Sequence, residues 1–223
     1  IEFETLFRPV LTLKKIKPEK KIKKKIMDIK KNILIIGASN GIGSELLNLI
    51  SINKKINIFA TYYKNKISSS QNVKFFKLDI NKPNKKLLSI LKKIKNGYLY
   101  YFATPKINIH DNSKKNYRAI KKYYYDFPIN ISKQLNKLGI SLFYPSSYLI
   151  DKYKNTSNYC KIKLLAEKKL KKLFSEYDSK LNILRISEVN TKQNLSVLFN
   201  NQYPQFYSLL KNKNEYKKKI FFS

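Results

Sequence analysis

Residues 36–43 read Ile36-Gly37-Ala38-Ser39-Asn40-Gly41-Ile42-Gly43. The chain of 223 residues has only five glycines, and three of them lie in this short segment. In a chain so poor in glycine, such a cluster indicates positions where the backbone tolerates no Cβ atom. An apolar run at 32–36 precedes the segment and an amphipathic run at 42–52 follows it, which predicts a turn from a buried strand into a helix. Such a turn either connects the two elements alone or also binds a pyrophosphate at the helix N-terminus.

Strand and helix patterns alternate along the rest of the chain. Further strands are expected at 56–61, 73–78, 98–103, 140–144 and 181–186, and helices at 83–95, 114–138 and 157–177. Pro128 is expected to interrupt the second of these helices, because proline lacks the N–H that a helix interior needs. The alternation predicts an α/β fold with a doubly wound, Rossmann-like parallel sheet and helices on both faces. After Thr191 we expect one or two helices and a last strand at 220–222.

The chain is long enough for one domain with a sizeable core. Residues 1–26 combine a β-prone run, broken by Pro9, with a lysine-rich stretch that contains Pro18 and continues to residue 31. This composition is typical of a solvated extension or linker. Met27 stands just before the first expected strand. We therefore predict a dinucleotide-binding domain at 27–223, attached through residues 1–26 to an upstream segment.

The formal net charge is +33, and its composition argues against nucleic acid as the partner. Only three of the 47 basic residues are arginines, namely Arg8, Arg118 and Arg185. Arginine is favoured where phosphates and bases are recognised. The abundance of lysine, with little glycine or arginine, is instead typical of drift toward AT-rich codons at surface positions.

Several other classes are disfavoured by what the sequence lacks. No apolar run approaches the roughly 18 residues that span a bilayer, so no membrane partner is predicted. Cys160 is the single cysteine, which excludes an internal disulfide and favours a reducing, cytoplasmic location. His110 is the single histidine, so neither a metal site nor a Ser–His–Asp triad is predicted.

Two motifs resemble those of the short-chain dehydrogenase/reductase family. The first is the GxxxGxG spacing from Gly37 to Gly43, and the second is YxxxK from Tyr159 to Lys163, which share one helix face. The resemblance covers about residues 31–191, although Ile36 stands where the family usually has threonine. It implies an NAD(P)-dependent oxidoreductase that acts on a small-molecule carbonyl or alcohol and forms a homo-oligomer.

The resemblance also implies a catalytic group. Tyr159 would be the acid–base residue, and a nearby ammonium such as that of Lys163 lowers the pKa of a phenol. Ser146 and Ser147 lie thirteen and twelve residues before Tyr159, and either could polarise the substrate carbonyl; we favour Ser147. Asn130 resembles the family asparagine that holds a proton-relay water.

The expected cofactor is NADP(H), with NAD(H) as the alternative. NAD-specific loops carry an acidic residue after the second strand, whereas Tyr63 and Lys64 stand here. Asp79 matches an acidic residue beside the adenine, or else it is a turn or capping residue. The residues implied in cofactor binding are Gly37, Ser39, Asn40, Gly41, Ile42, Gly43, Tyr63, Lys64, Asp79, Ala103, Tyr159, Lys163, Val189 and Thr191.

Two departures from the family pattern leave alternatives open. The family's NNAG segment is Tyr101-Phe102-Ala103-Thr104 here, and its Pro-Gly after the sixth strand is Ile186-Ser187. The first segment, with the sequence from Leu184 to Val189, also resembles the epimerase/dehydratase branch of the family. A nucleotide-sugar epimerase or dehydratase and a non-catalytic dinucleotide-binding module are therefore the alternative functions.

Overall fold

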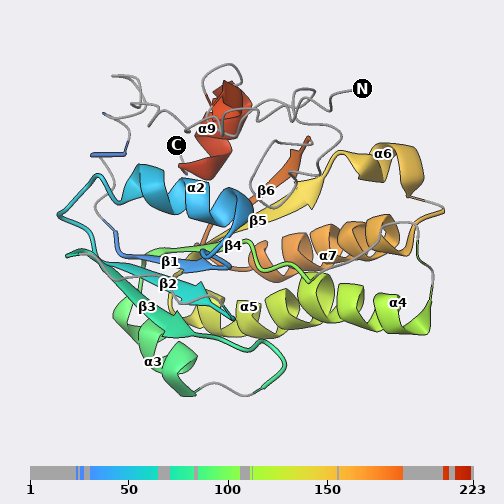
Figure 1. The fold of residues 1–223 in the computed structure, drawn as a ribbon, viewed down its shortest axis with the longest axis horizontal. Helices are drawn as coiled ribbons and strands as arrows, with labels where there is room; N and C mark the ends of the chain where they lie inside the picture. The colour runs from blue at the N-terminus through green and yellow to red at the C-terminus, as the bar shows by residue number, and fades with distance from the viewer. Residues whose placement is uncertain are drawn as a thin grey trace, which may run out of the picture.

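The computed structural model describes residues 24, 26–27, 31–64, 71–82, 85–105, 111, 113–154, 156–187, 208–210 and 214–221. Within these residues six parallel strands form one sheet in the order β3-β2-β1-β4-β5-β6 (Figure 1). This is the doubly wound arrangement predicted from the sequence. The strands are β1 (Ile33–Ile36), β2 (Ile58–Tyr62), β3 (Val73–Lys77), β4 (Tyr98–Tyr101), β5 (Ser141–Ser147) and β6 (Leu181–Ile186).

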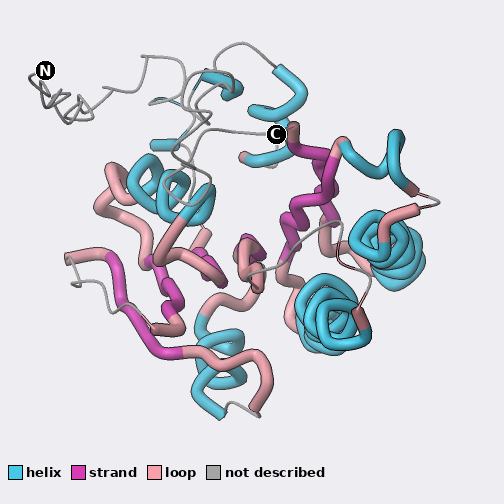
Figure 2. The backbone as a smooth tube through the Cα atoms, turned by 45° about the vertical axis from the view of Figure 1, so that its right-hand side comes forward, coloured by secondary structure: helices cyan, strands magenta, loops and turns pink. Residues whose placement is uncertain are grey.

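Helices connect the strands and cover both faces of the sheet. They are α2 (Gly41–Ile50), α3 (Lys85–Lys93), α4 (Lys114–Lys121), the π-helix η1 (Lys122–Asp126), α5 (Phe127–Lys137), α6 (Leu149–Tyr153), α7 (Asn158–Phe174) and α9 (Asn214–Ile220). Figure 2 shows the strands as a layer between the helices. None of the helices in the described part of the chain combines the length and the apolar character that a membrane span requires.

The apolar core consists of two layers, one on each face of the sheet. Successive strand residues point to opposite faces, so Ile33 and Ile35 of β1 pack toward α2 and α9. Leu34 and Ile36 pack instead toward α3, α5 and α7. Because β1 is buried on both faces, its sequence is apolar throughout rather than alternating, whereas the edge strand β3 has exposed lysines at Lys74 and Lys77.

The helical region predicted at 114–138 is continuous, with a π-helical turn just before Pro128. In this turn the N–H of Phe127 bonds the carbonyl of Lys122, five residues back. Since Pro128 has no N–H, it cannot donate to the carbonyl of Tyr124, four residues back. Buried tyrosine hydroxyls of the sheet donate to carbonyls of this turn, from Tyr101 to Tyr123 O at 2.6 Å and from Tyr144 to Tyr124 O at 2.7 Å.

At the two ends of the domain, Ile26 and Ile220 both pack into the core. The last strand expected at 220–222 is wrong for its described part, because Ile220 ends helix α9 and Phe221 follows in a turn. Both residues are buried against the sheet, where the Tyr100 hydroxyl donates to the carbonyl of Ile220 at 2.9 Å. Ile26, which the sequence analysis placed in the extension, is also fully buried and its carbonyl accepts a bond from Asn53. Packing of the core therefore includes a residue before Met27.

Candidate functional site

The loop after β1 is built around Gly37, which leads from the strand toward α2. Its φ is +86°, in the region that favours glycine, and a Cβ atom would lie 2.5 Å from the backbone nitrogen of Ala103. The N–H of Gly37 donates to Oγ1 of Thr61 at 2.9 Å, and the N–H of Ala38 donates to the Thr61 carbonyl at 3.1 Å. Thr61 of β2 therefore holds the loop in place, a role that the sequence analysis did not assign.

The N-terminus of α2 is suited to an anion. Gly43 packs so closely against the loop that a Cβ atom would overlap the carbonyl oxygen of Gly37. Within α2, which the structure describes in full, the first turn has no acidic residue and Asn40 makes no side-chain capping bond. Ser39 and Ile42 are half-buried in the same turn. Because the first N–H groups of a helix lack partners and its dipole favours negative charge, the loop fits the pyrophosphate of a dinucleotide.

This loop lies at the crevice where the two halves of the sheet meet. In the observed strand order the chain crosses from one half to the other between β1 and β4. Ligands of doubly wound sheets bind at this switch, beyond the carboxyl ends of the strands. Gly41, with φ +59°, and the half-buried Ala103 both lie at this edge. The structure thus brings together the predicted cofactor residues that follow β1 and β4.

The ends of β2 and β3 place Tyr63, Lys64 and Asp79 at the same edge of the sheet. Tyr63 and Lys64 are exposed. Oδ1 of Asp79 accepts hydrogen bonds from the backbone N–H and the side-chain amide of Asn81, each at 2.9 Å. These bonds, the backbone bond foremost, lower the pKa of Asp79. Asp79 therefore acts as a turn residue, which is the alternative role given from the sequence. Its carboxylate also stays charged, as the predicted position beside the adenine requires.

Tyr159 begins the candidate catalytic group, in the first turn of α7. Burial raises the pKa of Tyr159 to about 12, and a hydrogen bond with Ser147 acts in the opposite direction. Ser147 is buried at the end of β5, where its Oγ also accepts the N–H of Leu149 at 3.3 Å. The structure thus places the favoured serine beside the predicted acid–base tyrosine.

Lys163 follows one turn later on the same face of α7. Its side chain is 4% exposed, and Nζ donates to the carbonyl of Pro145 at 2.6 Å. Three tyrosine rings surround the ammonium, with centroids 4.5 Å (Tyr124), 5.4 Å (Tyr144) and 5.5 Å (Tyr159) from Nζ. Burial lowers the pKa of Lys163 to about 7.

Ser146 occupies a different environment from Ser147. Neighbouring strand residues point to opposite faces of a sheet, and Ser146 lies in register with Arg185 of β6. It is buried beside Glu167, two turns along α7 from Tyr159. The structure therefore separates the two candidate serines and puts Ser147 at Tyr159.

Glu167 and Arg185 form an ion pair behind the candidate site. Nε and one terminal nitrogen of Arg185 donate to the two carboxylate oxygens of Glu167 at 3.0 and 2.9 Å. The other terminal nitrogen donates to Asp151 of α6 at 2.5 Å. Burial raises the pKa of Glu167, but hydrogen bonds from Arg185 and Ser146, together with the charges of Arg185 and Lys171, outweigh it, so that the pKa falls below its usual value. This network links α6, α7 and β6, and the rarity of arginine in the sequence was its only signal.

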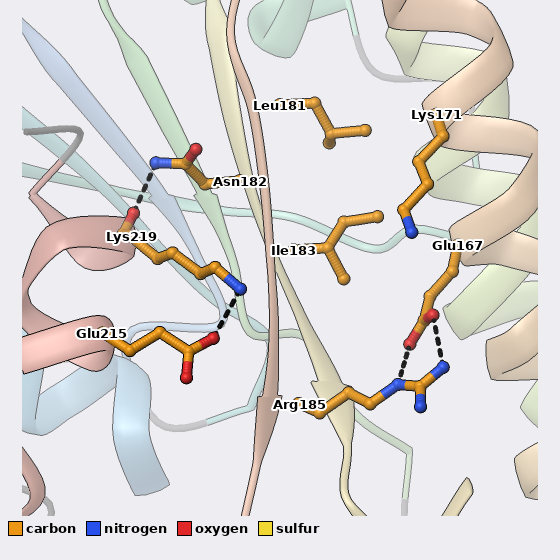
Figure 3. A pocket seen from close by; sticks show the side chains of 8 residues that line it. All are labelled: Glu167, Lys171, Leu181, Asn182, Ile183, Arg185, Glu215 and Lys219. Atoms are coloured by element: carbon orange, nitrogen blue, oxygen red, sulfur yellow. Dashed lines mark hydrogen bonds and ion pairs between the residues drawn. The ribbon is translucent and has the colours of Figure 1, made fainter. Parts of the chain in front are cut away.

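A cavity of about 430 Å³ lies away from the glycine loop, along the outer strand β6 of the described sheet. Figure 3 shows it between α7, which carries Glu167 and Lys171, and α9, which carries Glu215 and Lys219. Arg185 points from β6 toward Glu167 in this view. The cavity therefore shares the ion pair with the candidate site but contains none of its predicted residues.

The remaining predicted residues are not joined to this group. Asn130 is exposed on α5, six residues beyond Tyr124, which is about 9 Å along a helix axis. Its role in a proton relay stays a prediction. Val189 and Thr191 lie outside the described residues, as does His110.

Comparison with known proteins shows the same fold among solved dinucleotide-binding enzymes. A short chain dehydrogenase family protein from Francisella tularensis is 24% identical, with a TM-score of 0.61 over 73% of this chain and 71% of that one. A short chain dehydrogenase from Burkholderia cenocepacia, in complex with NADP, is 14% identical, with a TM-score of 0.62 over 79% and 78%. UDP-glucuronic acid 4-epimerase from Bacillus cereus, in complex with NAD, is 16% identical, with a TM-score of 0.59 over 71% and 57%.

These similarities show that the chain has the Rossmann fold of short-chain dehydrogenases and related epimerases. The chain spans 57% of the length of the epimerase. No family model matches the sequence, and no curated protein matches it. The predicted fold is thus confirmed by structure, while the chemistry depends on the site itself.

Proposed function

We propose that the protein is an NADPH-dependent oxidoreductase that reduces a small-molecule carbonyl to an alcohol, or catalyses the reverse. One observation carries the proposal: Ser147, Tyr159 and Lys163 come together at the carboxyl edge of the sheet. The loop from Gly37 to Gly43 opens at that same edge. A proton donor and an anion cradle thus share one crevice.

The chain offers a distinct place for each part of a dinucleotide. The glycine loop and the N-terminus of α2 would hold the pyrophosphate. Tyr63 and Lys64, with no acidic residue between them and β2, suit a 2′-phosphate better than a free ribose hydroxyl. Asp79 would lie toward the adenine. When bound, the nicotinamide ring supplies or accepts the hydride.

The protein side chains manage the proton and the carbonyl oxygen. With a pKa of about 12, Tyr159 is a neutral phenol at pH 7 and can donate its proton to a nascent alkoxide. The hydroxyl of Ser147 can donate a hydrogen bond to the same oxygen and stabilise its developing charge. The Lys163 ammonium stabilises the phenolate that remains, and the ribose hydroxyls of the cofactor would be its other partner. Reduction is therefore favoured at neutral pH and alcohol oxidation at higher pH.

The test begins with binding. Calorimetric titration with NADPH, NADP⁺, NADH and NAD⁺ is expected to show selective binding of the two phosphorylated forms. A carbonyl screen with Tyr159→Phe should then show loss of turnover with nearly unchanged cofactor affinity. Tyr177→Phe, an exposed tyrosine just beyond the end of α7, is the matched control and should keep activity. Folded protein that binds none of the four would exclude the proposal, and binding without any turnover would leave a non-catalytic dinucleotide module.

A nucleotide-sugar epimerase or dehydratase is the second candidate. Its support is the segment from Tyr101 to Thr104, where only Ala103 matches the reductase pattern, together with the structural similarity to the UDP-glucuronic acid 4-epimerase. In such an enzyme the hydride leaves the sugar and returns to it, so the cofactor stays bound. Dinucleotide that copurifies with the protein, and turnover of sugar nucleotides without added cofactor, would favour this candidate over the reductase.

The assembly around the site is part of the same proposal. We place the catalytic domain at 27–223, behind an extension at 1–26 of which Ile26 packs into the domain core, and expect a cytoplasmic homo-oligomer. Size-exclusion chromatography with light scattering would test the oligomer directly.

A further inference from the structure

The π-helix η1 places one tyrosine against the lysine of the proposed site. Tyr124 is 5% exposed, and its ring centroid lies 4.5 Å from Nζ of Lys163, the shortest of the three ring distances. The same ring meets the ring of Tyr159 edge to face, with centroids 5.3 Å apart and an interplanar angle of 83°. Tyr124 therefore contacts both members of the proposed Tyr–Lys pair from a separate element.

This placement depends on the π-helical turn. The turn shifts the helical register just before Pro128, and the hydroxyls of Tyr101 and Tyr144 donate to the carbonyls of Tyr123 and Tyr124 in it. Both hydroxyl donors are fully buried in the sheet. The backbone of Tyr124 is thus fixed to β4 and β5, the strands that border the crevice. Single π-helical turns inside α-helices occur frequently at functional sites.

Besides the ring of Tyr124, the described residues around the Lys163 ammonium offer it a carbonyl, a carboxylate and two further rings. The Pro145 carbonyl accepts one hydrogen bond from Nζ. Glu167 of α7, which is engaged in the bidentate pair with Arg185, favours the charged form of Lys163 from one turn away. The titratable and charged groups that face Lys163 from all packed elements are Tyr124 of η1, Tyr144 of β5, and Tyr159, Cys160 and Glu167 of α7.

We infer that Tyr124 is a positioning residue, whose ring face holds the Lys163 ammonium in its charged form beside Tyr159. Its functional meaning rests on the proposed reductase or epimerase site. A cation over an aromatic face is attracted by the ring quadrupole, most strongly where water is excluded. The electron density of the ring, and not the phenol hydroxyl, is therefore the property that matters at this position.

The test varies that electron density at constant shape. Phenylalanine and its mono-, di- and trifluorinated forms are incorporated at position 124 by nonsense suppression. The titration of Lys163 is followed in the ligand-free full chain by NMR of ¹³C-labelled lysine, and its signal is identified by its loss in Lys163→Met. The pKa of Lys163 should stay near its wild-type value in Tyr124→Phe and fall stepwise, by about one unit at three fluorines.

Two further variants distinguish the effect of the Tyr124 ring from a general effect of substitutions in this turn. Tyr124→Leu should lower the pKa of Lys163 at least as far as the trifluorinated ring does. Tyr125→Leu, whose ring lies over Lys121 in the same turn, should leave it unchanged. If the Lys163 titration is the same across the fluorinated series, the inference is overturned, and the series tests it even if Tyr124→Leu does not fold. Failure of the proposed function would show separately, as absence of dinucleotide binding to the wild-type protein.

Discussion

Replacement of Lys163 by methionine should change how the stability of the protein depends on pH. Burial lowers the pKa of Lys163 to about 7 from a reference value of 10.5. Between these values the unfolded chain binds a proton that the folded protein does not, so the free energy of unfolding rises with pH. Raising the pH relieves the folded state of a buried charge, whereas Lys163→Met carries no such charge at any pH.

The change in the free energy of unfolding follows from the pH range between the pKa values of Lys163 in the folded and the unfolded chain. Each pH unit in which the proton is bound only in the unfolded state contributes about 1.4 kcal/mol. Lys163 is half-protonated near pH 7 in the folded protein, so the gain from pH 7 to pH 9 is about 2 kcal/mol. The comparison stops at pH 9 because burial also raises the pKa of the Cys160 thiol. A raised thiol pKa makes the free energy of unfolding fall as the pH rises further, opposite to the effect of Lys163.

Urea unfolding at pH 7, 8 and 9, followed by circular dichroism, measures this gain directly. From pH 7 to pH 9 the free energy of unfolding should rise by about 2 kcal/mol more in the wild type than in Lys163→Met. Lys161→Met removes an exposed lysine from the same helix and should keep the wild-type pH dependence. If Lys163→Met and the wild type change in parallel, Lys163 is already charged when folded, and the account of its burial is wrong.

Three further outcomes follow from the geometry of the site. Gly43→Ala should abolish dinucleotide binding and lower the unfolding midpoint, since its Cβ atom would overlap the Gly37 carbonyl; retained affinity in calorimetry would contradict the cradle. Arg185→Lys should lower the free energy of unfolding by about 1–2 kcal/mol, measured by urea unfolding, because a lysine cannot bind Glu167 through two parallel bonds. The loss is smaller than for a fully buried ion pair because Arg185 is partly exposed. Tyr144→Phe should cost about 1–3 kcal/mol by leaving a buried carbonyl of η1 without its donor, and amide exchange in η1 should quicken; an unchanged exchange rate would show that the hydroxyl does not hold the turn.

The fold could be predicted because its signals are local. A buried parallel strand needs a continuous apolar run, and a close βα turn needs glycine, so the segments around Gly37 define the first βαβ unit without knowledge of the rest. The expected strand at 220–222 failed for a related reason. A short apolar run fits a strand or the end of a packed helix equally well, and burial against the sheet made Ile220 the end of α9.

The candidate site could be predicted only in part. Tyr159 and Lys163 are one turn apart on one helix, so their spacing alone predicts that they share a face. Tyr124 reaches them from an element 35 residues away in sequence from Tyr159, through a π-helical turn that no short pattern reveals. The two tyrosine hydroxyls that stabilise this turn come from strands whose patterns indicate only burial.

The two candidate serines, Ser146 and Ser147, which spacing alone does not distinguish, lie in different environments in the structure. A strand alternates its side chains, so only one of two adjacent serines can face a given helix turn. The ion pair of Arg185 and Glu167 lies on the side of Ser146, in register across β5 and β6. Ser146 therefore lies beside the charged pair, while Ser147 hydrogen-bonds Tyr159 and is the serine that we propose for the substrate carbonyl.

Compositional drift gives a reason to regard the same ion pair as constrained. The chain has 47 basic residues and only three of them are arginines, a composition typical of a chain in which lysine is used wherever either cation is tolerated. Arg185 binds both oxygens of Glu167 and also Asp151, which requires the planar, multiply donating guanidinium. Glu167 raises the pKa of Lys163 from one turn away along α7, so the guanidinium that pairs with Glu167 bears on how strongly this carboxylate favours a charged Lys163. In the proposed mechanism Arg185 would thus act on Tyr159 through Glu167 and Lys163, without contacting it.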